Sequence, residues 1–139
     1  VAGVSSGQEV LSHEAYSPGR LDAALADGRA VFVNMTAAWC ITCLVNERVA
    51  LDDPAVAAGF AEADLLYLKG DWTNRDPAIT DYLAGFGRNG VPIYVLYPPG
   101  GEPRVLPQIL TPGIVTAALA DAGLMPRVSS TLNQPGANP

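Results

Sequence analysis

The residues best suited to chemistry in this chain are its two cysteines, Cys40 and Cys43, which are separated by two positions. An apolar run over Ala30–Thr36 predicts a strand before them, and apolar residues at positions 41, 44, 45 and 49 predict a helix after them. A thiol at a helix N-terminus meets free backbone N–H groups and the positive end of the helix dipole, which favour a thiolate. We therefore expect Cys40 to be the nucleophile in disulfide exchange and Cys43 to be the resolving thiol.

The composition limits the classes of partner that this chain can bind. With 139 residues, 49% of them hydrophobic, it is long enough for one globular domain. Its formal net charge of -6 argues against nucleic acid and anionic membranes, which attract basic surfaces. No apolar run is long enough to span a bilayer, and neither an initiator Met nor a signal peptide is present. These features predict either a mature, processed product or an excised domain. The small, polar segments with Gly, Pro and Ser at both ends favour a single domain excised from a longer protein, and we expect it to be monomeric.

Metal and cofactor chemistry is not predicted by the remaining residues. One Cys-x-x-Cys supplies two ligands of a structural zinc site, whereas such sites use four. The only histidine is His13, far from the cysteines in sequence, and it is more typical of a surface position. We expect no metal and no cofactor, because the two sulfur atoms can carry the redox chemistry themselves.

The elements that would position the cysteines are marked by turn and capping residues. A capping residue followed by proline predicts a helix start at four places, Ser17-Pro18, Asp53-Pro54, Asp76-Pro77 and Thr111-Pro112. Apolar runs predict further strands over Leu65–Lys69, Ile93–Tyr97 and Arg104–Leu106, the last two forming an antiparallel hairpin. This order predicts an α/β fold with a mixed central sheet and helices on both faces.

The ends of the chain lack such patterns. Residues 1–16 are expected to be a lead-in, with an edge strand somewhere in Glu9–Tyr16. Residues 17–124 carry all the predicted helices and the central strands, and we expect them to form the folded domain. Residues 125–139 contain Pro, Gly, Asn and Ser without periodicity, which predicts a flexible tail.

Two motifs carry a family resemblance. The segment Ala38–Cys43 (Ala-Trp-Cys-x-x-Cys) resembles the thioredoxin active-site motif, and Phe86–Pro92 (Phe-Gly-x-x-Gly-Val-Pro) resembles the loop that holds the thioredoxin cis-proline. Glu47 followed by Asp52–Val56 is similar to the C-terminal periplasmic domain of DsbD, a transmembrane thiol:disulfide interchange reductase. The segments Gly70–Asn74 and Tyr97–Gly101 look more like the ScsB branch of that group, which is named for copper sensitivity.

The resemblance implies a thioredoxin fold and a protein-disulfide reductase activity. Electrons would reach the Cys40–Cys43 pair from a transmembrane thiol-transfer domain and pass to a periplasmic thioredoxin-like protein or domain. The chain would then be periplasmic and part of an inner-membrane protein. Trp39, Val91 and a cis-Pro92 would form the groove that binds the partner.

Two positions depart from the thioredoxin pattern. Thioredoxins carry a buried Asp six residues before the first cysteine, whereas this chain has Asn34, an amide that cannot accept a proton. Glu47 lies four residues after Cys43 and is the better candidate for proton transfer. The residue after the expected cis-proline is often Thr in this family and is Ile93 here, which makes the rim of the dithiol more apolar.

Three other functions remain open at this point. A free-standing thioredoxin-like oxidase or isomerase would share the dithiol but have a higher reduction potential. A copper-binding or copper-stress module would use the same two thiols as soft Cu(I) ligands. A docking domain without redox activity would keep its partner when both cysteines are replaced by alanine.

Overall fold

The structure, a computed structural model, describes residues 12–124. Its elements in chain order are β2 (Glu14–Ala15), α1 (Pro18–Ala26), β3 (Val31–Thr36), α2 (Ile41–Asn46), the π-helical turn η1 (Glu47–Leu51), α3 (Pro54–Glu62), β4 (Leu66–Asp71), α4 (Pro77–Gly85), β5 (Ile93–Tyr97), β6 (Arg104–Val105) and α5 (Pro112–Asp121). Most of the predicted lead-in and the whole predicted tail lie outside the described residues, and the domain limits stay a prediction. No helix in the described range has the length and apolar character needed to cross a membrane.

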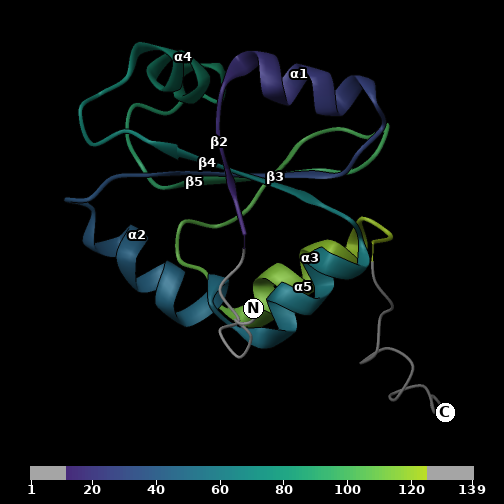
Figure 1. The fold of residues 1–139 in the computed structure, drawn as a ribbon. Helices are drawn as coiled ribbons and strands as arrows, with labels where there is room; N and C mark the ends of the chain where they lie inside the picture. The colour runs from purple at the N-terminus through teal and green to yellow at the C-terminus, as the bar shows by residue number, and fades with distance from the viewer. Residues whose placement is uncertain (1–11, 125–139) are drawn as a thin grey trace, which may run out of the picture.

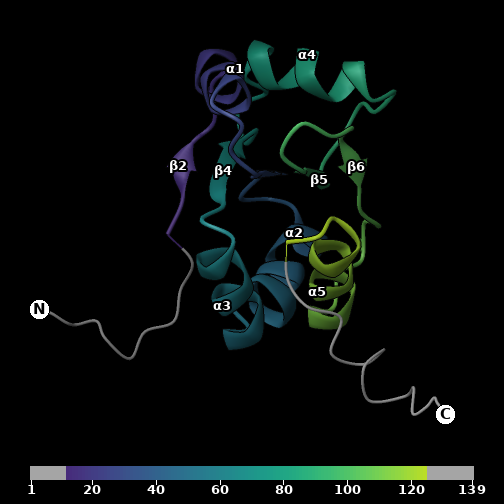
Figure 2. The same ribbon diagram turned by 90° about the vertical axis from the view of Figure 1, so that its right-hand side faces the viewer.

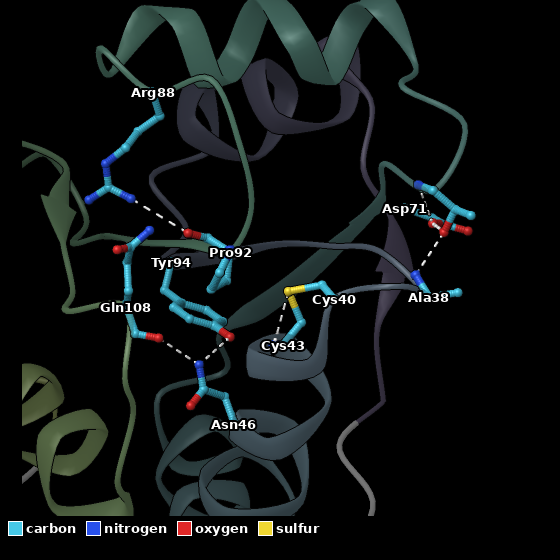
Figure 3. Close-up of a disulfide and its surroundings, with 10 residues drawn as sticks. Ala38, Cys40, Cys43, Asn46, Asp71, Arg88, Pro92, Tyr94 and Gln108 are labelled. Carbon is cyan, nitrogen blue, oxygen red and sulfur yellow. Dashed lines mark hydrogen bonds between the residues drawn. A yellow bond between two sulfur atoms is a disulfide. The ribbon is translucent and has the colours of Figure 1, made fainter.

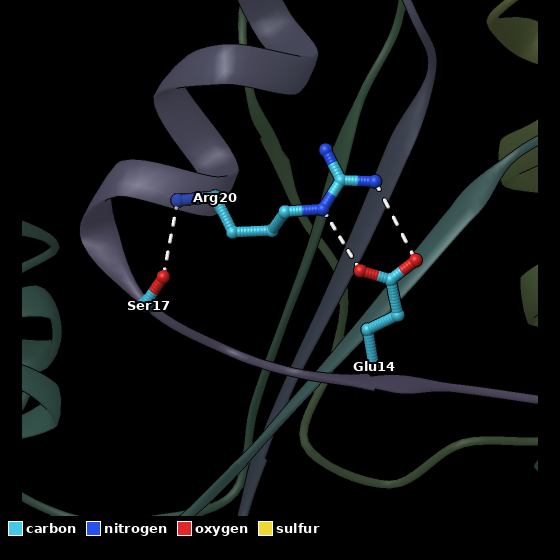
Figure 4. A network of polar contacts seen from close by, with 3 residues as sticks. All are labelled: Glu14, Ser17 and Arg20. Carbon is cyan, nitrogen blue, oxygen red and sulfur yellow. Dashed lines mark hydrogen bonds and ion pairs between the residues drawn. The ribbon is translucent and has the colours of Figure 1, made fainter.

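Side-chain caps start the four helices at which the sequence predicts them. The side chains of Ser17, Asp53, Asp76 and Thr111 each accept a backbone N–H from the first turn, and proline follows each of them. The cap of α1 is reinforced by an ion pair in which Arg20 Nε donates to Glu14 Oε1 at 2.8 Å (Figure 4). This hydrogen bond holds the pKa of the Glu14 carboxyl below its usual value, and the pair links α1 to β2.

The strands form one mixed sheet in the order β2-β4-β3-β5-β6. β2, β4 and β3 run parallel, whereas β5 is antiparallel to β3 and β6 is antiparallel to β5. Helices α1 and α4 cover one face, and α2, α3 and α5 cover the other (Figure 1). Figure 2 shows β2 and β6 at opposite edges of this sheet. The predicted mixed α/β sheet with helices on both faces is confirmed, including the final antiparallel hairpin.

The central strand β3 divides the core into two layers. All six of its residues are buried, as its nearly continuous apolar sequence predicts. Phe32 packs with Phe60 of α3 and Leu119 of α5, whereas Val33 packs on the opposite face with Leu83 of α4. Because side chains alternate along a strand, Asn34 points to the same face as Phe32, the face that α2 also covers.

The helix after the cysteines is present, but its apolar stripe faces solvent. Ile41, Leu44, Val45 and Val49 are all exposed. The side of α2 and η1 that packs on the sheet instead carries Cys43, Asn46, Ala50 and Leu51. Three of these four residues are small or polar, and they allow the helix to lie close to the sheet. The apolar spacing therefore identifies a helix but not its buried side.

Gly70 of β4 is required by a close approach between two elements. A Cβ at this position would overlap Met35 Sδ and lie 3.0 Å from Ile79 Cδ1. We expect Gly70→Ala to lower the free energy of unfolding by about 1–3 kcal/mol, the usual cost of overpacking a core. Gly19→Ala is the matched control, because nothing lies within 4 Å of the added methyl group. Urea unfolding followed by tryptophan fluorescence compares the two variants. Equal free energies of unfolding would show that the side chains around Gly70 can move to accommodate a methyl group.

Candidate active site

The two cysteines form a disulfide at the start of α2, with their Cα atoms 5.3 Å apart (Figure 3). Cys40 is the N-cap of the helix, and its Sγ accepts the backbone N–H of Cys43 at 3.1 Å. Cys43 is fully buried, whereas Cys40 keeps 7% of its surface exposed. A thiolate arriving from outside therefore meets the sulfur of Cys40 first.

A proline loop forms the wall beside the disulfide. The Val91–Pro92 peptide bond is cis, in the conformation that the motif predicts. Val91 packs against the small buried cluster of Ala37, Cys40 and Cys43. Arg88 Nη1 reaches back to the Pro92 carbonyl at 3.5 Å, and Figure 3 shows Pro92 on the loop that holds Val91 beside the cysteines. The structure thus brings Val91 and Pro92 to the cysteines, and their part in partner binding remains a prediction.

The segment after β4 forms the opposite wall. Thr73 Oγ1 accepts the Ala38 N–H at 2.8 Å, and the Thr73 carbonyl accepts Trp39 Nε1–H at 3.1 Å. The Arg75 guanidinium lies 5.3 Å from the ring centre of Trp39 and 4.5 Å from that of Trp72. These contacts fix the orientation of Trp39 while about half of its surface stays exposed. The sequence alone does not indicate that Arg75 belongs to this site.

Asn34 is buried and does not act as a proton acceptor in this geometry. Its Nδ2 donates to Tyr67 Oη at 2.9 Å, and among the described residues its Oδ1 has no hydrogen-bond partner. Burial raises the pKa of Tyr67 above its ordinary value, so this phenol is neutral at physiological pH. The pair is therefore uncharged, in contrast to the carboxylate that thioredoxins carry at the position of Asn34.

Glu47 forms a partly buried ion pair with Lys69. Lys69 Nζ lies 3.3 Å from Glu47 Oε1, and the side chains keep 27% and 22% of their surface exposed. Both line a cavity of about 490 Å³, together with His13 and Asp71. Glu47 follows Cys43 by one turn, and its N–H donates to the Cys43 carbonyl. The cavity gives solvent a route to this carboxylate, and proton transfer by Glu47 stays a prediction.

Asn46 is a site residue that sequence reasoning missed. Its Nδ2 donates to Tyr94 Oη at 2.9 Å and to the Gln108 carbonyl at 2.7 Å (Figure 3). Its Oδ1 accepts the Leu110 N–H at 3.0 Å. Burial raises the pKa of Tyr94 to about 12, so its hydroxyl stays protonated and able to donate or accept. Asn46 therefore attaches the helix that carries Cys43 to β5 and to the segment before α5.

Metal ligands do not gather around the disulfide. Within residues 12–124, no group of three or more His, Cys, Asp or Glu side chains is arranged to hold a metal ion. The chemistry that this arrangement supports is thiol–disulfide exchange at Cys40 and Cys43.

A mixed sheet with helices on both faces, a Cys-x-x-Cys disulfide at a helix start and a neighbouring cis-proline define a thioredoxin-like domain of the thiol:disulfide oxidoreductase type. A protein-family model described as thioredoxin-like matches residues 13–99. The chain belongs to this thioredoxin-like family.

Among the known proteins that this chain resembles are members of the DsbD group. The thiol:disulfide interchange protein DsbD 1 of Pseudomonas aeruginosa is 38% identical over 90 residues, which is 62% of this chain and 15% of that protein. The oxidised C-terminal domain of Neisseria meningitidis DsbD superimposes with a TM-score of 0.64 at 19% identity, over 80% of this chain and 99% of that domain. Its reduced form gives a TM-score of 0.60 at 18% identity, over 76% and 96% of the two chains.

These comparisons confirm a thioredoxin-like domain that resembles the C-terminal domain of DsbD. The Neisseria structures are under 25% identical to this chain and show the fold alone. The finer resemblance to the ScsB branch stays a prediction.

Proposed function

We propose that this chain is the periplasmic output domain of a DsbD-type inner-membrane reductase. It takes electrons from a transmembrane thiol-transfer domain and passes them to a periplasmic thioredoxin-like protein or domain. The observation that carries this proposal is the asymmetric disulfide, in which Cys40 is reachable at the helix start and Cys43 is buried behind it. The identity to the Pseudomonas protein supports the DsbD type.

The reaction follows from the positions of the two sulfurs. In the reduced domain, the Cys40 thiolate attacks the partner disulfide, which forms a mixed disulfide and releases one partner thiolate. The Cys43 thiolate then attacks Cys40 Sγ, which restores the Cys40–Cys43 disulfide and releases the second partner thiolate. Two electrons and two protons have reached the partner, and the upstream dithiol reduces the domain again by the reverse sequence of steps.

The surrounding residues support separate parts of this reaction. Trp39, Val91 and cis-Pro92 form the walls that hold the partner chain beside Cys40. Glu47 accepts the proton from the buried Cys43 thiol and passes it to solvent through the adjoining cavity, with Lys69 holding the carboxylate in place.

Replacing Glu47 with glutamine should slow the resolving step by about a hundredfold, the low end of what a positioned base contributes. The amide keeps the size of the side chain but cannot take the proton of Cys43. Rapid acid quench of the reaction with a peptide disulfide should then show accumulation of the mixed disulfide. Glu62→Gln, on the exposed surface of α3, is the control. An unchanged resolving rate in Glu47→Gln would leave Glu47 as a structural partner of Lys69.

The reduction potential of the Cys40–Cys43 pair tests the proposed direction of electron flow. Equilibration against a glutathione series, read by the fluorescence of Trp39 and Trp72, should give a value toward the thioredoxin end, at about -270 mV. A value near about -120 mV, typical of strong oxidases, would overturn the reductase assignment. The absence of a reversible transition, together with stoichiometric Cu(I) binding, would favour a copper module instead.

A further inference from the structure

The outward side of α2 and η1 is unusually apolar for a surface. Ile41 is 72% exposed, and Leu44, Val45 and Val49 are between 43% and 52% exposed. Trp39, 48% exposed, directly precedes Cys40, the N-cap of α2. Several exposed apolar side chains on one side of a helix are uncommon on monomeric proteins, and large apolar surfaces mark binding sites.

Ile109, in the segment before α5, adds an apolar side chain next to α2. Its neighbours in the chain, Gln108 and Leu110, both bond to Asn46 of α2 through their backbone groups. These bonds hold Ile109 beside the helix, and its side chain is 63% exposed. We call Trp39, Ile41, Leu44, Val45, Val49 and Ile109 the α2 docking face.

The α2 docking face begins at the dithiol and extends well beyond it. Ile41 directly follows Cys40, whereas Val49 lies about 12 Å further along the helix, given a rise of about 1.5 Å per residue. A small disulfide that reacts with Cys40 needs only the rim formed by Trp39 and Pro92. The remainder of the face is positioned to contact a larger molecule while its disulfide lies at Cys40.

Both signs of charge border this face: Glu47 is paired with Lys69 and Asp52 ends η1, whereas three arginines lie within the face or near the dithiol. Arg48 lies within the face, Arg75 stacks on Trp39 and Arg88 reaches the Pro92 carbonyl. Arg20, Arg29 and Lys69 are held in ion pairs, whereas Arg48, Arg75 and Arg88 take part in none within the described residues. Three arginines at or near this apolar surface, in no ion pair within residues 12–124, favour an acidic partner although the chain has a net charge of -6.

We propose that the α2 docking face binds the disulfide-bearing region of a partner protein whose apolar side chains are bordered by carboxylates. This inference rests on the proposed function, because the partner is the protein that exchanges its disulfide with Cys40. A second copy of this chain fits less well, since symmetric pairing would bring Arg48 of one copy toward Arg48 of the other. An anionic membrane fits less well because the net charge of the chain opposes it.

Peptide disulfides of opposite charge test the inference on the full chain in its reduced form. The two probes are symmetrical disulfides in which Leu and Glu, or Leu and Lys, flank the cysteine over about five residues on each side. Five extended residues reach about 16 Å, enough to extend from Cys40 to Val49. Uncharged hydroxyethyl disulfide is the third probe, and it is too small to reach beyond the rim.

Two variants, each with a matched control, separate charge from apolar contact. Arg48→Glu reverses the charge within the face, and Arg104→Glu makes the same change on β6. The double variant Val45→Ser/Val49→Ser removes apolar surface from the face, and Val105→Ser does so on β6, where the valine is 43% exposed. All these side chains are exposed, so the variants should fold as the original chain does.

The original chain should reduce the Leu-Glu peptide about tenfold faster than the Leu-Lys peptide, as electrostatic complementarity raises association rates. Arg48→Glu should cancel or reverse that preference, and Val45→Ser/Val49→Ser should slow the Leu-Glu reaction by about tenfold. Hydroxyethyl disulfide should react within about twofold of the original rate in every variant, and the β6 controls should change nothing.

Other outcomes would overturn either the α2 docking face or the proposed reductase function. Equal rates for the two peptides, or equal effects of Arg48→Glu and Arg104→Glu, would overturn the docking face. A dimer in sedimentation that Val49→Ser dissociates, or binding to phosphatidylglycerol vesicles that Arg48→Glu abolishes, would assign the face to a second copy or to a membrane. Failure of the original chain to reduce hydroxyethyl disulfide would instead count against the proposed function. Fluorescence anisotropy of a Leu-Glu peptide with Ser in place of Cys would then still measure docking.

Discussion

A Cys43→Ser variant should keep its partner attached to Cys40 and complete no turnover. Cys40 is the cysteine that keeps exposed surface, so the first attack does not require Cys43. Without the resolving thiol, the mixed disulfide has no internal route to release the partner. The reduced variant should therefore form a covalent adduct with a peptide disulfide, visible by mass spectrometry under non-reducing conditions.

Cys40→Ser is the informative counterpart of this variant. It retains Cys43, which is fully buried and cannot be reached by a partner disulfide in this structure. We expect no adduct and no exchange, with circular dichroism showing that the fold persists. An adduct formed through Cys43 in this variant would contradict the assignment of Cys40 as the nucleophile.

Local signals in the sequence are sufficient to predict most of the fold. Capping side chains followed by proline act within three residues, so Ser17 and Thr111 mark their helices without any knowledge of the tertiary structure. Similarly, the nearly continuous apolar run of β3 indicates a strand covered on both faces. The cysteine pair and the proline motif come from two separate segments, and the fold brings Val91 beside Cys40.

The site residues that the sequence did not predict depend on contacts between distant segments. The partners of Asn46 lie 48, 62 and 64 residues further along the chain, so no local pattern relates them. The stack of Arg75 on Trp39 likewise joins segments that lie far apart in sequence. A helical repeat of apolar residues also cannot distinguish a buried stripe from a docking surface, which is why α2 was predicted without its orientation.

Replacing Asn46 with alanine should lower the free energy of unfolding by about 3 kcal/mol, a large fraction of the stability of a typical domain. The substitution removes three hydrogen bonds at once and leaves the Tyr94 hydroxyl, the Gln108 carbonyl and the Leu110 N–H without their partner. Each buried polar group left unpaired costs about 1–3 kcal/mol, and solvent entering the vacated space offsets part of that cost. Urea unfolding of the oxidised protein, followed by tryptophan fluorescence, measures the change.

Asn74→Ala is the matched control for Asn46→Ala, because it removes the same side chain from an exposed turn. Its stability should stay within about 0.5 kcal/mol of the original chain, as for most surface substitutions. If Asn46→Ala unfolded at the same urea concentration as Asn74→Ala, the amide would not be what holds α2 in place. The attachment of the helix would then rest on the packing of Ala50 and Leu51. A large loss confined to Asn46→Ala would show that a single buried amide fixes the helix on which both cysteines depend.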